Sequence, residues 1–325
     1  MRKFLTVMTL AACLAGTGFA SAQDYPNRPI TLVIPFAAGG PTDLLGRAMA
    51  PHIGEILGQQ VAIENVGGAG GILGSLQVAH AAPDGYTVLL GTAGTHAQNQ
   101  SLYRHPRYNA VTDFTPVALV AELPIVLVVN RDLPVKNLKE FKAYANKNKD
   151  RMQYGSAGAG SAAHLGCLLA NRALGIQIRH VPYSGTALAM DDLIAGRIDY
   201  VCDIITTAKR KIDPGEVKPI AILAQARSPA LPNVATALEQ GVMKLEAYTW
   251  NAFFLPKGAP ADVVKKLNWA IMQAAKSPAV RQSLESLGAV FVSDDRMTPE
   301  YLGQFVRSEI ENWAVPIKAS GVSIE

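Results

Sequence analysis

Pro35-Phe36-Ala37-Ala38-Gly39-Gly40-Pro41-Thr42-Asp43 is a glycine-bearing turn, and Gly155-Ser156-Ala157-Gly158-Ala159-Gly160-Ser161-Ala162-Ala163-His164, about 120 residues later, is a second one. Each turn follows a short run that is typical of a strand, residues 31–34 and 152–154, and opens a segment with the apolar periodicity of a helix. The start of a helix presents unpaired N–H groups and a partial positive charge, so a turn of small residues lets a carboxylate or phosphate approach the backbone. We expect the two turns to lie on separate lobes and to clamp an anion between them.

Strand-like and helix-like segments alternate along most of the chain, which predicts an α/β fold built on parallel sheets. We expect strands at residues 30–35, 61–64, 87–91, 152–155, 178–181, 198–202 and 219–223, and a long β-rich stretch at 116–130 that Pro124 breaks. Helices are expected at residues 42–57, 72–81, 138–148, 161–174, 186–195, 261–276, 279–287 and 299–319.

The C-terminal segment has several helices and few strands, so it cannot build a sheet of its own. We expect it to return to the first lobe, which requires crossings near residues 118–124 and 222–227. The predicted lobes are residues 23–122 with 225–325, and residues 123–224, each a central sheet flanked by helices. In open parallel sheets ligands bind beyond the carboxyl ends of the strands, where the two turns lie. This organisation describes a hinged protein with its ligand in the cleft.

The first 22 residues have the pattern of a secretion signal: Arg2-Lys3, an apolar stretch over residues 4–20, and the small residues Ala20-Ser21-Ala22 before the cut. An alternative is lipoprotein processing at Leu10-Ala11-Ala12-Cys13, which we disfavour because the apolar run continues past Cys13. No other stretch has the roughly 18 apolar residues of a membrane span. We therefore expect a mature chain that starts at Gln23 and works in the periplasm.

Composition indicates a globular chain without a nucleic-acid partner. Hydrophobic residues make up 49% of the 325 residues and charged residues 17%. The formal net charge falls from +4 to +2 when Arg2 and Lys3 leave with the signal, which holds no Asp or Glu. Basic residues are densest at 136–151, where a solvated helix face explains them.

Cys167 and Cys202 remain after processing, one on a predicted helix and one on a predicted strand. An oxidising compartment would allow them to pair, but their spacing matches no disulfide motif. We favour two buried thiols and leave a disulfide open.

Several stretches together resemble the Bug family, the solute-binding receptors of tripartite tricarboxylate transporters. The resemblance runs from about Tyr25 into the C-terminal helices and implies a type II periplasmic binding protein of the Venus-flytrap kind. It also implies a carboxylated solute held through backbone amides and ordered waters, and a membrane permease as partner. The stretches are Tyr25-Pro26-Asn27-Arg28-Pro29-Ile30, Pro35-Phe36-Ala37-Ala38-Gly39-Gly40, residues 61–65 with Gly68-Ala69-Gly70-Gly71, Ala82-Pro83-Asp84-Gly85-Tyr86-Thr87, residues 154–164, and His180-Val181-Pro182-Tyr183-Ser184-Gly185.

Two departures from the family pattern leave the ligand open. Members commonly carry Asn-Pro-x-Leu-Tyr after the third strand, whereas this chain has His96-Ala97-Gln98-Asn99-Gln100-Ser101-Leu102-Tyr103. Members usually have Lys-Gly after Val-Pro-Tyr, and here Ser184 replaces that lysine. Aliphatic dicarboxylates or tricarboxylates and aromatic carboxylates are equally consistent with the sequence.

The first turn supplies the strongest candidate ligand contacts, Gly39, Gly40 and Thr42, with Ala38 beside them. A tight turn with a purely structural role is the alternative for the glycines. Phe36 is expected either to wall the pocket or to belong to the lobe core.

The second turn supplies Ser156, Ala159, Gly160 and Ser161, although Ser161 is also a good helix cap. His164 is a further candidate, against a structural role inside its lobe that we also expect for His180.

Thr92 and Thr95 follow a strand and could bond the distal end of a ligand. Asp203 would accept from an ammonium group of an amino-acid ligand, or cap local backbone.

No catalytic or cofactor-binding motif is present with the residue spacing that it requires. A nucleophile elbow needs Gly two residues before its Ser, but Tyr154 precedes Ser156 and Ala159 precedes Ser161 in that place. The dinucleotide fingerprint fails at Leu73, the His and Cys residues lack metal-ligand spacing, and no Walker sequence is present. We expect no catalytic residue, metal or cofactor, and therefore no enzyme. We expect the protein to be a monomer. Signalling to a periplasmic sensor kinase domain is the alternative function, with an ester hydrolase third.

Overall fold

The computed structural model describes residues 25–243, 245–320 and 323–324. The expected signal sequence and Cys13 lie outside the described residues. No helix within these ranges is both long and apolar enough to cross a membrane.

The first lobe is built on a sheet in which three parallel strands are followed by antiparallel ones. Parallel strands β1 (Ile30–Ile34), β2 (Val61–Asn65) and β3 (Thr87–Thr92) are joined by helices α1 (Pro41–Leu57) and α2 (Ile72–Ala79). Strand β9 (Tyr248–Pro256) runs antiparallel to β3 and to β4 (Phe114–Asn130), and β10 (Val290–Phe291) pairs with β4. Between β3 and β4 lie a π-helical turn, Gly94–Gln98, and the short helix α3 (Asn99–Leu102).

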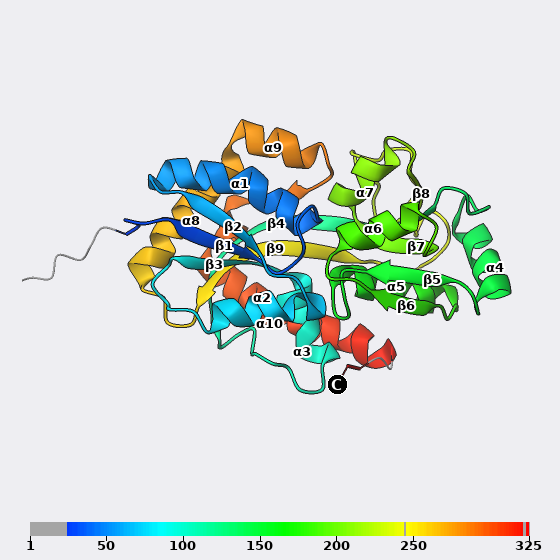
Figure 1. Cartoon of the computed structure of the whole chain (residues 1–325), viewed down its shortest axis with the longest axis horizontal. Helices are drawn as coiled ribbons and strands as arrows, with labels where there is room; N and C mark the ends of the chain where they lie inside the picture. Colours follow the sequence, from blue (N-terminus) through cyan, green and yellow to red (C-terminus); the bar gives the residue numbers. More distant parts are fainter. Residues whose placement is uncertain (1–24, 244, 321–322, 325) are drawn as a thin grey trace, which may run out of the picture.

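The second lobe shares β4 with the first. From Ile125 onward β4 pairs with β7 (Tyr200–Ile204) and β8 (Val217–Ile222), and β5 (Gln153–Ser156) and β6 (Arg179–Pro182) extend the sheet in parallel with β7. Its helices are α4 (Leu138–Asn148), α5 (Ala162–Leu174), α6 (Thr186–Ile194) and α7 (Ile205–Ile212). Figure 1 places these green elements on one side of the molecule, with β4 and β9 running between the two lobes.

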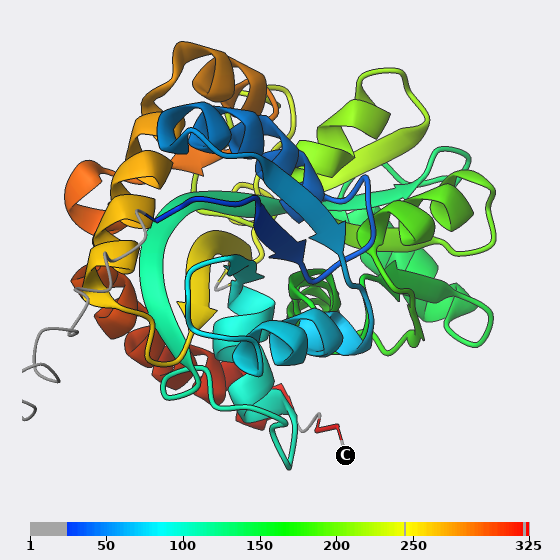
Figure 2. The same cartoon turned by 60° about the vertical axis from the view of Figure 1, so that its left-hand side comes forward.

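The C-terminal helices cover the first lobe. They are α8 (Ala261–Lys276), α9 (Pro278–Glu285) and α10 (Pro299–Ser320), with a short 3-10 turn at Asp294–Met297. Figure 2 shows β4 (teal) curving round with these orange and red helices outside it. The buried Glu309 of α10 accepts hydrogen bonds from Tyr248 Oη and Trp250 Nε1 at 2.9 Å, which ties the last helix to β9.

Most predicted elements are found within two residues of their expected limits, but two expectations are wrong, and α7 and β9 were not expected. Pro124 does not break β4, because the strand changes partners there and needs no ladder hydrogen bond from that residue. The sheets of both lobes are mixed rather than parallel. Strand β9 was not expected because it is buried on both faces and shows no alternation of apolar and polar residues.

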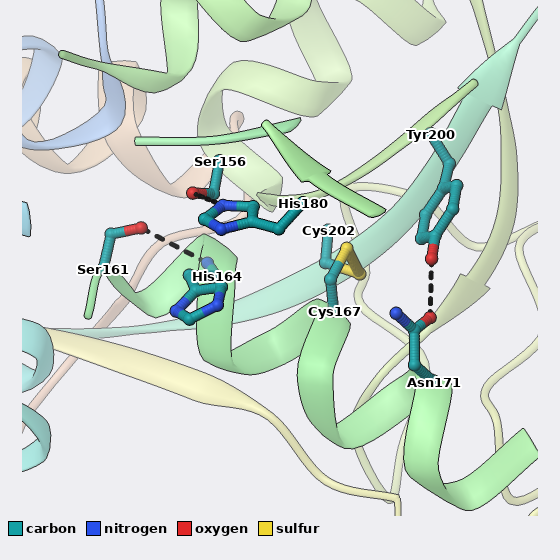
Figure 3. The surroundings of a disulfide bond; sticks show 8 residues. All are labelled: Ser156, Ser161, His164, Cys167, Asn171, His180, Tyr200 and Cys202. Atoms are coloured by element: carbon teal, nitrogen blue, oxygen red, sulfur yellow. Dashed lines mark hydrogen bonds between the residues drawn. A yellow bond between two sulfur atoms is a disulfide. The ribbon is translucent and has the colours of Figure 1, made fainter. Parts of the chain in front are cut away.

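Cys167 and Cys202 form a disulfide, which corrects the expectation of two free thiols (Figure 3). Both residues are fully buried, Cys167 on the inner face of α5 and Cys202 on β7. Their Cα atoms are 5.1 Å apart, within the range that a disulfide spans. Tertiary packing of the helix on the strand therefore creates a pairing that sequence spacing did not indicate.

Residues that follow β8 stay on the second lobe for some distance. Gln240 Oε1 accepts from the Leu138 N–H at 2.8 Å, and Gln240 Nε2 donates to Ile220 O at 2.9 Å. Ala247 still contacts second-lobe residues, because its N–H donates to Leu223 O at 2.8 Å and its carbonyl accepts from the Ile125 N–H at 3.2 Å. From Tyr248, which pairs with Pro124, the chain runs along the first-lobe part of β4.

Candidate functional site

A small cavity of about 20 Å³ lies between the lobes, and both glycine-bearing turns line it. This volume holds about one water molecule, so a small organic acid can enter only when the lobes open. The first lobe contributes Phe36, Gly40, Pro41, Thr42, Thr92 and Thr249, and the second contributes Ala157, Ser161, Ala162, Ala163, Thr186 and Ile204.

Four helices begin at this cavity. The residues that cap α1, α5 and α7, namely Gly40, Ser161 and Ile204, line it, as does Thr186, the first residue of α6. Of the four capping residues only Ser161 has a side chain that accepts a hydrogen bond from its helix, from the His164 N–H. The other three helices therefore have first-turn N–H groups without a side-chain cap. Because no Lys or Arg is among the lining residues that the structure describes, helix ends supply the positive potential.

The first turn is held by Asp43. Its Oδ2 accepts from the Gly39 N–H and from Arg47 Nε, each at 2.8 Å, and Asn65 Nδ2 donates to Oδ1 at 3.0 Å. Burial alone would raise the pKa of Asp43, but these hydrogen bonds outweigh it and lower the pKa. The Gly39 N–H is thus already bonded, and Gly39 and Ala38 are exposed rather than in the cavity.

Two stacked histidines hold the second turn (Figure 3). His180 Nε2 and the Ser156 hydroxyl share a hydrogen bond of 2.7 Å, and His164 Nδ1 accepts from the Gly160 N–H at 3.1 Å. Burial lowers the pKa of His164 to about 3, with His180 contributing, and lowers that of His180 to about 4. Both imidazoles are therefore neutral at physiological pH, and His164 Nδ1 is free to accept.

Two further candidates, Thr95 and Asp203, do not line the cavity but are close in the chain to Thr92 and Ile204, which do. Thr95 Oγ1 accepts from the Thr92 N–H at 2.9 Å and so holds the exit of β3. Asp203 is fully buried and accepts from the Thr207 hydroxyl through Oδ2, while its Oδ1 has no partner. Burial raises the pKa of Asp203 to about 7.

Five of the thirteen predicted site residues line the cavity and eight do not. The first group is Phe36, Gly40, Thr42, Thr92 and Ser161. The second is Ala38, Gly39, Thr95, Ser156, Ala159, Gly160, His164 and Asp203.

Sequence reasoning missed two cavity hydroxyls, those of Thr186 and Thr249. Thr186 follows Gly185 at the start of α6, so this helix begins at a small residue, as the helices after the two glycine-bearing turns do. The same pattern in the sequence could therefore have identified Thr186 as a candidate. Thr249 lies inside β9 and carries no local signal.

A second contact joins the lobes beside the cavity. We call Gly70, Tyr103, Gly158 and Ala159 the clasp. The Tyr103 hydroxyl donates to Ala159 O at 3.2 Å, with Ala69 O at 3.5 Å. A Cβ on Gly70 would lie 2.0 Å from Ala159 O, and one on Gly158 would lie 2.9 Å from the Gly70 nitrogen. The turn at Gly68-Ala69-Gly70-Gly71 and the second glycine-bearing turn therefore touch through their backbones.

A larger groove of about 850 Å³ lies on the first lobe between β4, α8 and α10, away from both turns. Apolar side chains such as Phe114 and Val264 form much of its lining. None of the buried polar side-chain atoms without a partner, among the described residues, belongs to it. The smaller cavity between the lobes is therefore the candidate functional site.

Comparison with known proteins agrees with this architecture. A family model described as the tripartite tricarboxylate transporter family receptor matches residues 45–322. The periplasmic binding protein BugD superposes with a TM-score of 0.90 at 38% identity, covering 93% of this chain and 100% of that one.

Two similar structures from Rhodopseudomonas palustris contain carboxylates. MatC with bound malate has a TM-score of 0.88 at 40% identity, covering 90% of this chain and 100% of MatC. A second R. palustris protein, with adipate, has a TM-score of 0.87 at 34% identity, covering 92% of this chain and 99% of the other.

Proposed function

Because this chain belongs to the tripartite tricarboxylate transporter receptor family, we propose that it captures a small carboxylated solute in the periplasm and delivers it to the permease subunits of such a transporter. The solute binds in the cavity between the lobes, with a carboxylate at the helix starts. Aliphatic dicarboxylates are the favoured class, because one similar protein holds malate and another adipate.

The observation that carries this proposal is the convergence of four helix N-termini on a cavity without a cationic lining. One anion gains about 0.3–1 kcal/mol at a helix N-terminus, and roughly 2 kcal/mol in partly buried geometry. Micromolar affinity corresponds to about 8 kcal/mol, so the helix ends supply part of it. Cavity hydroxyls, ordered waters and closure of the lobes supply the rest.

Closure couples binding to recognition by the permease. We propose that the lobes rotate about β4 near residues 123–125 and about the second crossing. Contacts of Gln240 with Leu138 and Ile220 support a second crossing at 246–248, so that lobe 2 extends beyond the expected boundary at residue 224. The membrane component would then distinguish a receptor closed on its solute from an open one.

A thermal-shift screen of organic acids, followed by calorimetry of the best ligand, tests the proposal. A solute that binds only the folded protein stabilises it by about 2.7 kcal/mol at a hundredfold excess over Kd, so the melting temperature must rise. Failure of every carboxylate to raise it would contradict the proposed class.

The variant Gly40→Val tests whether the ligand binds at the start of α1. Gly40 has φ −76°, and a Cβ there would lie 3.5 Å from its nearest atom, so the fold accepts a side chain that obstructs the helix start. We expect binding to weaken by at least about tenfold at an unchanged ligand-free melting temperature. Gly303→Ala, on α10 and away from the cavity, is the matched control and should bind like the wild type. Gly39 and Gly160 are less suitable because each has φ +82°, which strains any other residue.

A further inference from the structure

Thr249 lines the cavity, and its hydroxyl has no hydrogen-bond partner. Its side chain is fully buried at the start of β9. By contrast, the hydroxyls of two other lining residues, Thr92 and Ser161, each accept from a backbone N–H. A buried hydroxyl without a partner is unfavourable, so native proteins seldom retain one unless a ligand or water satisfies it.

Strand register places Thr249 at the hinge end of the cavity. Thr249 lies opposite Leu123 of β4, and Ile204 lies opposite Ile125, two residues further along the same strand. Strand β4 changes from the first sheet to the second at this point. Thr249 therefore lies where the lobes are joined, on a strand rather than at one of the four helix starts.

The ligand groups that would bind at the helix starts differ from the group that suits Thr249. A second carboxylate on the ligand would need several N–H donors, and those lie at the helix starts. A ligand hydroxyl can both donate and accept a hydrogen bond, and the Thr249 hydroxyl has both capacities unused.

We propose that the Thr249 hydroxyl bonds a hydroxyl group on the carbon next to a ligand carboxylate, so that the receptor selects 2-hydroxy dicarboxylates over unsubstituted ones of equal length. This inference rests on the proposed function and names the ligand class more closely. Thr249 is then a residue that determines specificity, while the helix starts bind the carboxylates that both classes share.

Calorimetry with malate, succinate and aspartate on the wild type and on Thr249→Val tests the proposal. Malate and succinate differ only in the 2-hydroxyl, and aspartate replaces it with an ammonium group. We expect the wild type to bind malate about tenfold more tightly than succinate, since one hydrogen bond to a buried partner has about this effect. Thr249→Val, which keeps the shape, should lose this preference by weakening malate alone.

Thr249→Ser is the matched control, because it keeps a hydroxyl and should restore the preference for malate. Unchanged succinate affinity in Thr249→Val shows that the variant is folded. Equal binding of malate and succinate by the wild type, or equal losses of both in Thr249→Val, would overturn the inference. Tighter binding of aspartate than malate would overturn it in favour of an amino-acid ligand.

A longer pair, adipate and 2-hydroxyadipate, separates this inference from the proposed function. If the receptor binds only acids of this length, the same preference is expected between these two, and its absence contradicts the role of Thr249. If no carboxylate of either length binds, the proposed function itself is wrong.

Discussion

Asp203 and the histidine pair show how burial sets the charge of single residues near the cavity. Burial raises the pKa of Asp203 to about 7 and lowers those of His164 and His180 to about 3 and 4. The folded protein therefore holds a proton on Asp203 more tightly than the unfolded chain does. It holds protons on the histidines less tightly. The two effects have opposite signs in the pH dependence of stability.

Asp203→Asn isolates the first effect. Between about pH 4 and pH 7 the folded wild type binds the Asp203 proton and the unfolded chain releases it, so this group's contribution to stability falls as pH rises through that window. Asn cannot ionise, so the free energy of unfolding of the variant should rise relative to that of the wild type as pH rises. The relative gain should reach roughly 4 kcal/mol at pH 8.

Urea unfolding of both proteins at pH 4.5, 6 and 8 measures this difference. The histidines contribute equally to both proteins and cancel. A stability difference that is constant over this range would mean that Asp203 is ionised throughout.

Helix starts were the positions at which single residues could be placed from the sequence. Gly40, Thr42 and Ser161 line the cavity, because glycine, proline and serine at a helix start are recognisable over a few residues, and their contact with a ligand stays a prediction. Thr249 was not expected to line the cavity, since the neighbouring sequence does not distinguish a threonine in a cavity from one in the hydrophobic core. Its position depends on which strand lies beside β4.

At the scale of elements, the disulfide fixes α5 against β7. Ser161 at the start of α5 and Ile204 at the end of β7 both line the cavity, and the bond between Cys167 and Cys202 joins the two elements that carry them. The bond therefore supports the half of the site that the second lobe contributes.

Cys167→Ala with Cys202→Ala should lower stability by about 3–4 kcal/mol, the loop-closure value for a crosslink over 35 residues. A thermal or urea melt measures the loss, and reduction of the wild type should reproduce it. Reductant should leave the double variant unchanged. A wild type whose melting temperature is the same with and without reductant would argue against the bond.

Strand prediction succeeded for β1, β2 and β3 and failed for β9. The first three stand between helices and end at turn residues, which local patterns reveal. Strand β9 is central in the sheet and buried on both faces, so its sequence lacks the alternation that marks a half-exposed strand. Its pairing with β3 and β4 is decided by packing across more than 100 residues of chain.

At the scale of the whole molecule, the clasp contributes to closure without lining the cavity. Tyr103 belongs to the first lobe and donates to Ala159 of the second, so this hydrogen bond exists only when the lobes meet. A contact of this kind shifts the balance between open and closed receptors by the same free energy for every ligand.

Tyr103→Phe should therefore raise Kd by a common factor for all ligands, about fivefold for one hydrogen bond of roughly 1 kcal/mol. Calorimetry with several carboxylates measures the factor, and small-angle X-ray scattering should detect a more open ligand-free protein. Tyr144→Phe, on α4 of the second lobe, is the matched control and should bind like the wild type. Factors that differ between ligands would mean that Tyr103 contacts the solute instead.

Family membership was predicted from short motifs and is confirmed by the match over residues 45–322. The two-lobed architecture was predicted from the alternation of strands and helices and agrees with BugD.

The sequence by itself determined most helix starts, most strands and the family, because hydrogen bonding within a helix and the conformations of glycine and proline depend on neighbours a few residues away. Only the tertiary structure revealed α7, brought its start and that of α6 to the same cavity as those of α1 and α5, paired Cys167 with Cys202, and buried Thr249 where β4 changes its partner strands. These contacts join segments tens to hundreds of residues apart. The packing of sheets and helices, rather than local conformational preference, decides them.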